Sequence, residues 1–114
     1  MVKNYIPERG DLVFVNFIPQ AGREESGRRP ALVLSPRAYN EKTGLALFCP
    51  ITSKAKGYPF EVSLQENARI HGVVLADAVK NLDWRARKAS LAGHISEAAL
   101  REVSQKLAIL LQLN

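Results

Sequence analysis

Two charged segments of the chain carry the residue types that could act on a phosphodiester. The first, GREESGRRP (22–30), places carboxylates and arginines directly before an apolar run. Arg29 is a permanent cation that can hold a phosphate through two parallel hydrogen bonds, and Pro30 fixes the direction in which the chain enters the apolar run. Glu24 and Glu25 are acceptors and potential general bases. This segment could therefore accept a proton and stabilise a negative charge.

The second segment, PITSKAKG (50–57), follows another apolar run and combines hydroxyl groups with cations. Thr52 and Ser53 supply the hydroxyls, and Lys54 and Lys56 supply the charge. If the ends of the two apolar runs meet, these side chains could converge on a phosphodiester. The residues alone leave a second interpretation open, in which both segments are plain solvated loops.

The remaining reactive residues favour no other catalytic chemistry. The chain has two histidines, one cysteine and no cluster of carboxylates at ligand spacing, so it resembles no zinc or two-metal site, and we expect no cofactor. His71 and His94 each stand beside a glycine and are interpreted as loop residues. Cys49, in LALFCP, is interpreted as a small buried hydrophobe.

Length and charge describe a small basic protein. The 114 residues, 46% of them hydrophobic, suit a single domain spanning 1–114. The net charge of +5 favours an anionic partner such as nucleic acid. No apolar run reaches membrane-spanning length and the start of the chain lacks the apolar core of a signal peptide, so we expect a cytoplasmic protein.

One basic stretch also contains the single tryptophan of the chain. In KNLDWRARK (80–88), lysines and arginines surround Trp84. Bases interleaved with an aromatic side chain could bind phosphates and stack a nucleobase. In the alternative interpretation, which we favour for Trp84, the ring belongs to the core and the bases form a solvated rim.

Short apolar runs at close spacing predict strands over most of the chain. We expect these strands at 10–17, 30–36, 45–52, 60–64, 72–79 and near 87–92. A turn, or one helical turn, is expected at 38–44. Strands followed by a terminal helix predict a mainly β fold, a small, strongly bent sheet or barrel capped by one helix.

The end of the chain has the pattern of an amphipathic helix. Ser96 is a good N-cap, and four apolar residues recur on one helical stripe: Leu100, Val103, Leu107 and Leu110. Ile109, Leu111 and Leu113 lie off that stripe. A helix that is apolar on more than one side favours a second packing partner, such as another subunit.

The chain resembles the MazF/PemK family of bacterial toxins, the endoribonuclease half of toxin–antitoxin pairs. Its motifs cover nearly the whole chain, among them GRRPALVLSP (27–36), CPITSKAKGYPFEV (49–62) and VVLADAVKNLDWRAR (73–87). The resemblance implies an SH3-like barrel of short antiparallel strands with a C-terminal helix (MazF/PemK/CcdB-like), assembled as a homodimer.

The activity that the resemblance implies is metal-independent cleavage of single-stranded RNA, chiefly mRNA, at a short sequence. The 2′-hydroxyl attacks and leaves a 2′,3′-cyclic phosphate and a 5′-hydroxyl, which would inhibit translation and growth. The implied partner is an acidic antitoxin of the MazE type, whose C-terminal tail would occupy the RNA groove.

The resemblance also assigns site residues. Its catalytic positions fall on Arg29, which would stabilise the phosphorane, on Thr52, which would hydrogen-bond a phosphate oxygen, and on Glu24, which would accept the 2′-hydroxyl proton or position the nucleotide. Candidates for RNA contact are Ser53, Lys56, Phe17, Asn40, Lys80, Arg28 and Arg87. Some relatives carry histidine at position 28, where this chain has arginine, which leaves more weight on Glu24 and Arg29.

Two other functions remain open from the sequence. One is a CcdB-like toxin of the same fold that binds DNA gyrase and cuts no RNA. Those relatives use an aromatic tail on the terminal helix, whereas this chain ends in LLQLN and keeps Arg29 and Thr52. The other is an SH3-like module that binds RNA without cutting it.

Overall fold

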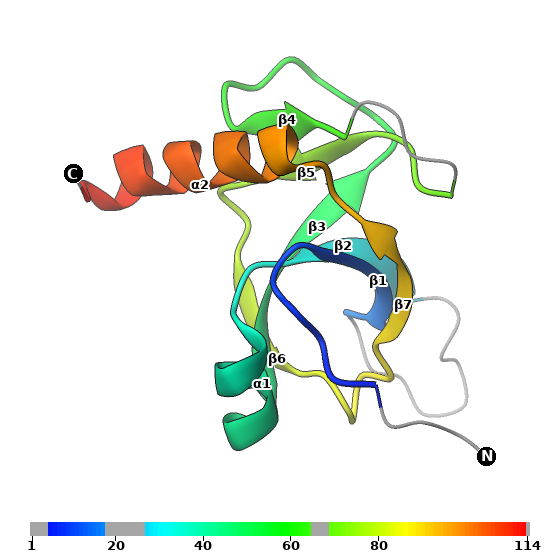
Figure 1. Ribbon diagram of the computed structural model, residues 1–114. Helices are drawn as coiled ribbons and strands as arrows, with labels where there is room; N and C mark the ends of the chain where they lie inside the picture. The colour runs from blue at the N-terminus through cyan, green and yellow to red at the C-terminus, as the bar shows by residue number, and fades with distance from the viewer. Residues whose placement is uncertain (1–4, 18–26, 65–68, 114) are drawn as a thin grey trace.

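The computed structural model describes residues 5–17, 27–64 and 69–113, and in this part of the chain seven strands and two helices form (Figure 1). The elements are β1 (Asp11–Asn16), β2 (Arg28–Val33), α1 (Arg37–Thr43), β3 (Leu45–Thr52), β4 (Glu61–Ser63), β5 (Val73–Leu75), β6 (Lys80–Asp83), β7 (Ser90–His94) and α2 (Glu97–Leu111). The predicted order of strands followed by a terminal helix is confirmed.

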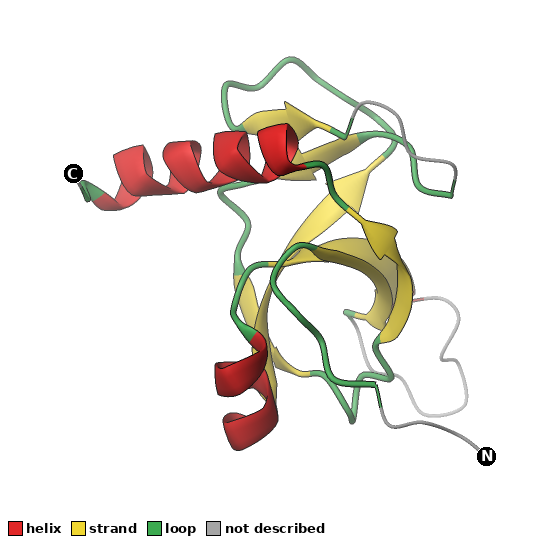
Figure 2. Ribbon diagram, in the orientation of Figure 1, coloured by secondary structure: helices red, strands yellow, loops and turns green. Residues whose placement is uncertain are grey.

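All the strand pairs are antiparallel, in the order β4-β5-β3-β2-β1-β7, and β6 pairs with β3 beside this path. The strands curl strongly (Figure 2), giving an SH3-like barrel whose sheet does not close. The eight-residue β3 pairs with a different strand at each end: Leu45–Phe48 pair with β6, and Ile51 and Thr52 pair with β5. The end of β3 therefore connects the β4–β5 pair to the rest of the sheet.

Both faces of the central strands are buried. Successive side chains of a strand point to opposite faces, and in β2 Leu32 packs into one apolar cluster while its neighbour Val33 packs into another. The first cluster includes Val103 of α2, which lies beside β4 and β5 in Figure 1. The second surrounds Phe48 and Trp84. Continuous apolar runs such as ALVL (31–34) follow from burial on both sides.

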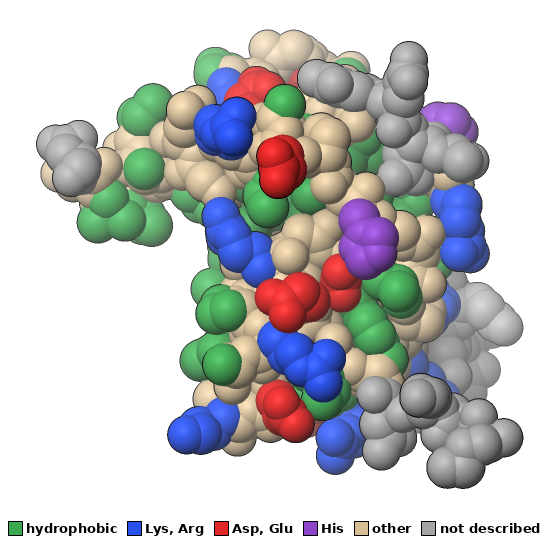
Figure 3. Space-filling view, in the orientation of Figure 1, with side chains coloured by type: hydrophobic (Ala, Val, Ile, Leu, Met, Phe, Trp, Pro, Cys, Tyr) green, Lys and Arg blue, Asp and Glu red, His purple; other side chains and the backbone are tan. Residues whose placement is uncertain are grey.

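The terminal helix begins as the sequence predicts. The Ser96 hydroxyl oxygen accepts a hydrogen bond from the Ala99 N–H at 3.1 Å, and Val103 is completely buried. Packing weakens toward the end, where Leu110 is 47% exposed, so the expected stripe is only partly covered. Exposed apolar side chains gather at this projecting end (Figure 3): Ile109, Leu110, Leu111 and Leu113. No helix in the described ranges is both long and apolar enough to cross a membrane.

The segment after β5 differs from the expectation. The run 72–79 was expected to be one strand, but β5 ends at Leu75, where its carbonyl accepts a hydrogen bond from the Ala78 N–H and a turn forms. β6 then begins at Lys80. The side chains of β6 are mostly polar and exposed, so it carries no apolar signal. The helix α1 is also longer than the single turn expected.

Asn40 belongs to the interior and not to an RNA-binding surface, which corrects its assignment from the sequence. Its side chain is completely buried: Oδ1 accepts from the Ser35 hydroxyl at 2.6 Å, and Nδ2 donates to the carbonyl oxygens of Pro7 and Ser35. Its backbone oxygen accepts from Trp84 Nε1 at 2.8 Å. Asn40 therefore joins α1 to the N-terminal segment and to the turn after β6, and Trp84 is a core residue as expected.

Replacing Asn40 by alanine should destabilise the protein by about 2–4 kcal/mol, because several buried polar groups lose their partner at once. Urea unfolding followed by far-UV circular dichroism measures this change. Asn81→Ala is the control, because that exposed amide reaches only the Tyr39 hydroxyl and should cost within about 0.5 kcal/mol. Equal losses in the two variants would contradict the structural role of Asn40.

Candidate active site

Pairing between β2 and β3 brings the two charged segments together. Ala31 lies opposite Pro50 in the ladder, and continuing this register by two residues sets Arg29 opposite Thr52. Both residues line one cleft of about 550 Å³, a volume in the range of small-molecule sites. Arg29 is exposed, whereas Thr52 is half-buried at the end of its strand. The cleft thus joins an exposed cation to a half-buried hydroxyl.

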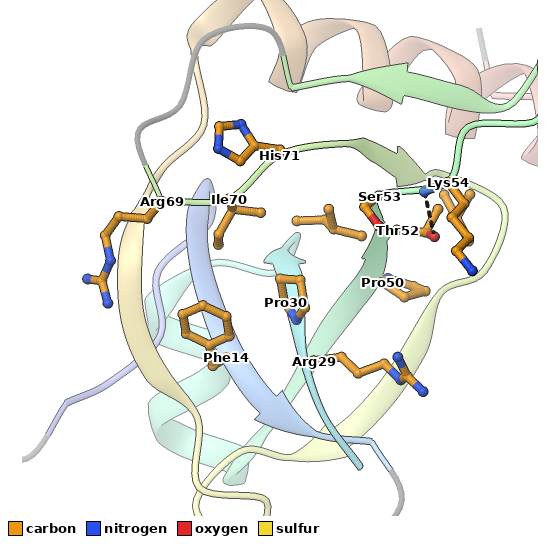
Figure 4. Close-up of a pocket in the computed structure, with 12 residues that line it drawn as sticks. Phe14, Arg29, Pro30, Pro50, Thr52, Ser53, Lys54, Arg69, Ile70 and His71 are labelled. Carbon is orange, nitrogen blue, oxygen red and sulfur yellow. Dashed lines mark hydrogen bonds between the residues drawn. The ribbon is translucent and has the colours of Figure 1, made fainter. Parts of the chain in front are cut away.

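The cleft has an apolar floor and basic rims (Figure 4). The floor includes the side chains of Phe14, Pro30 and Ile70. The cations and the histidine divide between two sides, Arg29 and Lys54 on one and Arg69 and His71 on the other. An apolar surface between positive side chains suits a ligand with flat, uncharged parts and anionic groups at its edges.

The Thr52 hydroxyl is oriented by its own loop. Its oxygen accepts a hydrogen bond from the Lys54 backbone N–H at 3.2 Å (Figure 4). A hydroxyl has one proton to donate and two lone pairs, so this bond leaves the proton for an acceptor in the cleft. The Thr52 backbone is held in turn by pairing with Val73. A phosphate oxygen is an acceptor that such a hydroxyl can bind.

Gly72 allows β5 to approach Thr52 closely. Its φ is +123°, a value that favours glycine, and a Cβ built there would lie 2.0 Å from the Thr52 carbonyl oxygen. No side chain fits at that distance. Gly72 therefore fixes the position of Thr52 and brings its neighbour His71 to the cleft.

Three of the predicted RNA-contacting residues occupy different places. Ser53 lines the same cleft as Thr52. Lys56 lines a second cavity of about 330 Å³, which shares Thr52, Lys54 and Leu75 with the first. Lys80 is exposed at the start of β6 and lines neither cavity.

The other predicted contacts support the ends of strands. Arg28 donates to the Ser90 hydroxyl at 2.7 Å and to Asn16 Oδ1 at 3.4 Å, which links β2 to β1 and β7. Arg87 donates to the carbonyl oxygens of Asn16 and Phe17. The Phe17 side chain packs against the second apolar cluster. These residues hold the strands that carry the cleft and do not line it.

The proposed base, Glu24, lies outside the described residues, so its position relative to Arg29 stays a prediction. Among the described residues that line the cleft there is no carboxylate. Two cleft residues, Arg69 and His71, were not identified from the sequence. Their only signal is the ARIHG segment (68–72), whose basic residues stand directly before a glycine and a strand.

The other reactive groups show no second centre in the described part of the chain. No three His, Cys, Asp or Glu side chains within the described ranges come close enough together to hold a metal ion. Burial, with a smaller contribution from Asp77, raises the pKa of the Cys49 thiol to about 12. The interpretation of Cys49 as a small buried hydrophobe is confirmed.

Comparison with known proteins points to one family. The family model for the PemK-like, MazF-like toxin of type II toxin–antitoxin systems matches residues 8–111. The endoribonuclease toxin MazF of Escherichia coli (strain K12) is 48% identical over 111 residues, covering 97% of this chain and 99% of that protein. The Escherichia coli endoribonuclease PemK is 35% identical over 108 residues, which cover 91% of this chain and 81% of the length of PemK.

Among solved structures, a MazE–MazF crystal structure from Deinococcus radiodurans matches with a TM-score of 0.87 and 50% identity. The match covers 97% of this chain and all of that one, 100%. A MazF crystal structure from the same organism is 55% identical with a TM-score of 0.86. The strand order and the terminal helix described above are therefore shared with these proteins.

Gly72→Ala should lower the free energy of unfolding by at least about 2 kcal/mol more than Gly57→Ala does. Both glycines have positive φ, +123° and +83°, but a Cβ at Gly57 meets nothing within 4 Å, so only the backbone strain of about 1–2 kcal/mol applies there. Urea unfolding of the two variants measures the difference. If they lose equal stability, the contact with Thr52 does not constrain the site.

Proposed function

The chain belongs to the PemK-like, MazF-like family of type II toxin–antitoxin toxins and is, like its named relatives, an endoribonuclease toxin; we propose that it cuts single-stranded RNA in the cleft between Arg29 and Thr52. The observation that carries this assignment is the cleft itself, where a guanidinium and an oriented hydroxyl flank an apolar floor. The substrate class proposed is mRNA, cut at a short sequence, with arrest of translation and growth as the result.

The proposed reaction is attack by the 2′-hydroxyl on the adjacent phosphorus. Glu24 accepts the 2′-hydroxyl proton, the O2′–P bond forms, and the P–O5′ bond breaks. The O5′ leaving group takes up a proton from water, giving a 2′,3′-cyclic phosphate and a 5′-hydroxyl. No metal or cofactor enters any of these steps.

Arg29 supports this reaction by electrostatics. The phosphorane carries more negative charge than the bound phosphodiester, and a cation already in place stabilises it without reorganisation. Its planar fork matches two phosphate oxygens. Thr52 adds one hydrogen bond from its oriented hydroxyl. We assign no proton transfer to Arg29, because a guanidinium stays protonated in proteins.

The remaining cleft residues serve binding. Lys54 and Arg69 stand on opposite sides of the apolar floor and would contact successive phosphates. The floor would contact ribose and base. Such a site predicts that RNA binding weakens steeply as salt rises, because each phosphate contact releases counterions.

We further propose that residues 1–114 form one toxin domain, acting in the cytoplasm as a homodimer. The family match over 8–111 supports the single domain, and the exposed apolar end of α2 supports a second packing surface. The partner is an antitoxin of the MazE type, as in the related crystal structure named a MazE–MazF complex. An acidic tail of that antitoxin would compete with RNA for the cations of the cleft.

Arg29→Ala should reduce the rate of RNA cleavage by at least about a hundredfold, on the order of 3 kcal/mol of barrier, because a preorganised charge on the phosphorane is lost. Purified protein is incubated with mRNA in EDTA, and the 5′ ends are sequenced. Arg37→Ala is the control, since it removes an exposed arginine of α1 that does not line the cleft.

The outcomes of this experiment separate the functions. Intact RNA with the unmodified protein would rule out the nuclease, and cutting that stops on chelation would rule out the metal-independent reaction. A rate for Arg29→Ala within about threefold of the unmodified protein would remove Arg29 from the transition state.

Glu24→Gln should lower kcat by about a hundredfold or more if the carboxylate takes the 2′-hydroxyl proton, since general-base catalysis contributes on that order. The neighbouring Glu25→Gln is the matched control, with the same loss of charge one residue away, and should stay near the unmodified rate. Single-turnover cleavage of a short RNA measures both variants. Equal rates for the two would assign the base elsewhere.

A further inference from the structure

A second cavity adjoins the cleft at Thr52. It measures about 330 Å³ and shares Thr52, Lys54 and Leu75 with the first cavity. A strand of RNA whose phosphate lies between Arg29 and Thr52 would therefore place a neighbouring nucleotide at this second cavity. Its own lining has a different chemistry, because it adds an aromatic ring and two carboxylates.

The two carboxylates are not equivalent. Both carboxylate oxygens of Glu61 already accept hydrogen bonds from the backbone. Its Oε2 accepts from the Lys56 N–H at 2.9 Å, and its Oε1 accepts from the Gly57 N–H at 3.0 Å. These bonds shape the loop after β3. Asp77 is exposed, lies two residues after the end of β5, and also lines the cavity. Asp77 is thus the lining carboxylate that we take to meet a ligand.

The aromatic ring is Tyr58, which is 61% exposed. It packs into neither apolar cluster, so it contributes little to the core. A nucleobase can stack on such a ring, and stacking favours no particular base. Lys54 and Lys56 on the same wall carry the charge for the flanking phosphates.

We propose that this cavity is a nucleobase subsite beside the scissile phosphate, in which Tyr58 stacks the base and Asp77 selects a base with an exocyclic amino group. The proposal rests on the cleavage site assigned above. A carboxylate only accepts hydrogen bonds, so it pairs with the amino groups of adenine, cytosine or guanine. Uracil has carbonyl oxygens in place of those amino groups, and a carboxylate repels them. Its remaining edge donor, N3–H, lies between two carbonyl oxygens, so a carboxylate binds it less well than an amino group. The subsite therefore discriminates against uracil at one position of the cleaved sequence.

The test uses 2′-deoxy hexanucleotides, which cannot be cut because they lack the attacking hydroxyl. At each position in turn, uracil is compared with cytosine, and binding is measured by fluorescence anisotropy in EDTA. At one position the unmodified protein should prefer cytosine by about tenfold, in the range expected of a hydrogen bond that reads a base edge. Asp77→Asn should reduce that ratio to within about twofold, because an amide can both donate and accept.

Glu41→Gln is the matched control, since it removes an exposed carboxylate of α1 that lines neither cavity. It should keep the cytosine preference. Tyr58→Ala should weaken binding of both oligonucleotides alike, whereas Tyr58→Phe should retain it because the ring remains.

A preference that survives in Asp77→Asn, that disappears equally in Glu41→Gln, or that is absent from the unmodified protein overturns the subsite. The cleavage assignment is tested separately with ribonucleotides of the same sequences. If these ribonucleotides stay intact while the cytosine preference depends on Asp77, the subsite is supported and the cleavage assignment is contradicted. If they are cut but Asp77→Asn cleaves at the same sequence as the unmodified protein, the subsite is contradicted and the cleavage assignment is supported.

Discussion

The antiparallel pairing of β2 with β3 is the interaction on which the cleft depends. It sets Arg29, near the start of β2, opposite Thr52, at the end of β3, although 22 residues of chain separate them. The pairing is also protected from slippage. A shift by one residue would exchange the two faces of β2 and move Leu32 and Val33 out of the clusters that they fill. The geometry of the exposed site is therefore set by the buried strands behind it.

The positive charge of the protein serves two different purposes. Arg28 and Arg87 are half-buried and donate to groups at the ends of neighbouring strands, so much of their donor capacity is used within the fold. Arg29 and Lys54 face the cleft instead. Basic and acidic side chains are also interspersed on the face seen in Figure 3. The net charge therefore indicates an anionic partner, but only the geometry shows which cations can meet it.

The sequence predicted the parts of the structure that local patterns specify. The bounds of β3 agree with its apolar run, and the Ser96 cap begins α2 where the polar-to-apolar pattern changes. β6 was missed because its exposed residues carry no alternation. Asn40 was assigned to RNA contact through the family resemblance, and its sequence position gives no sign of the three hydrogen bonds to Ser35 and Pro7 that hold its side chain in the interior. Arg69 and His71 join the cleft only through the pairing of β5 with β3, a contact between distant segments.

The two cavities around Thr52 divide affinity from selectivity. Phosphates are the same in every RNA, so the cations that line the cleft can contact the backbone of an RNA of any sequence. A carboxylate beside such a cleft repels the phosphates of every RNA and so lowers affinity in general. The carboxylate improves discrimination between bases only if it contacts a base edge. Because a carboxylate has no hydrogen to donate, it binds amino groups there and not carbonyl oxygens. Asp77 therefore lies where repulsion from the backbone can be offset by a hydrogen bond that one base lacks. In the arrangement that we propose, the residues that cut RNA and the residue that chooses the base line two adjoining cavities that share Thr52, Lys54 and Leu75. The cleaved sequence could then change without any change in the chemistry.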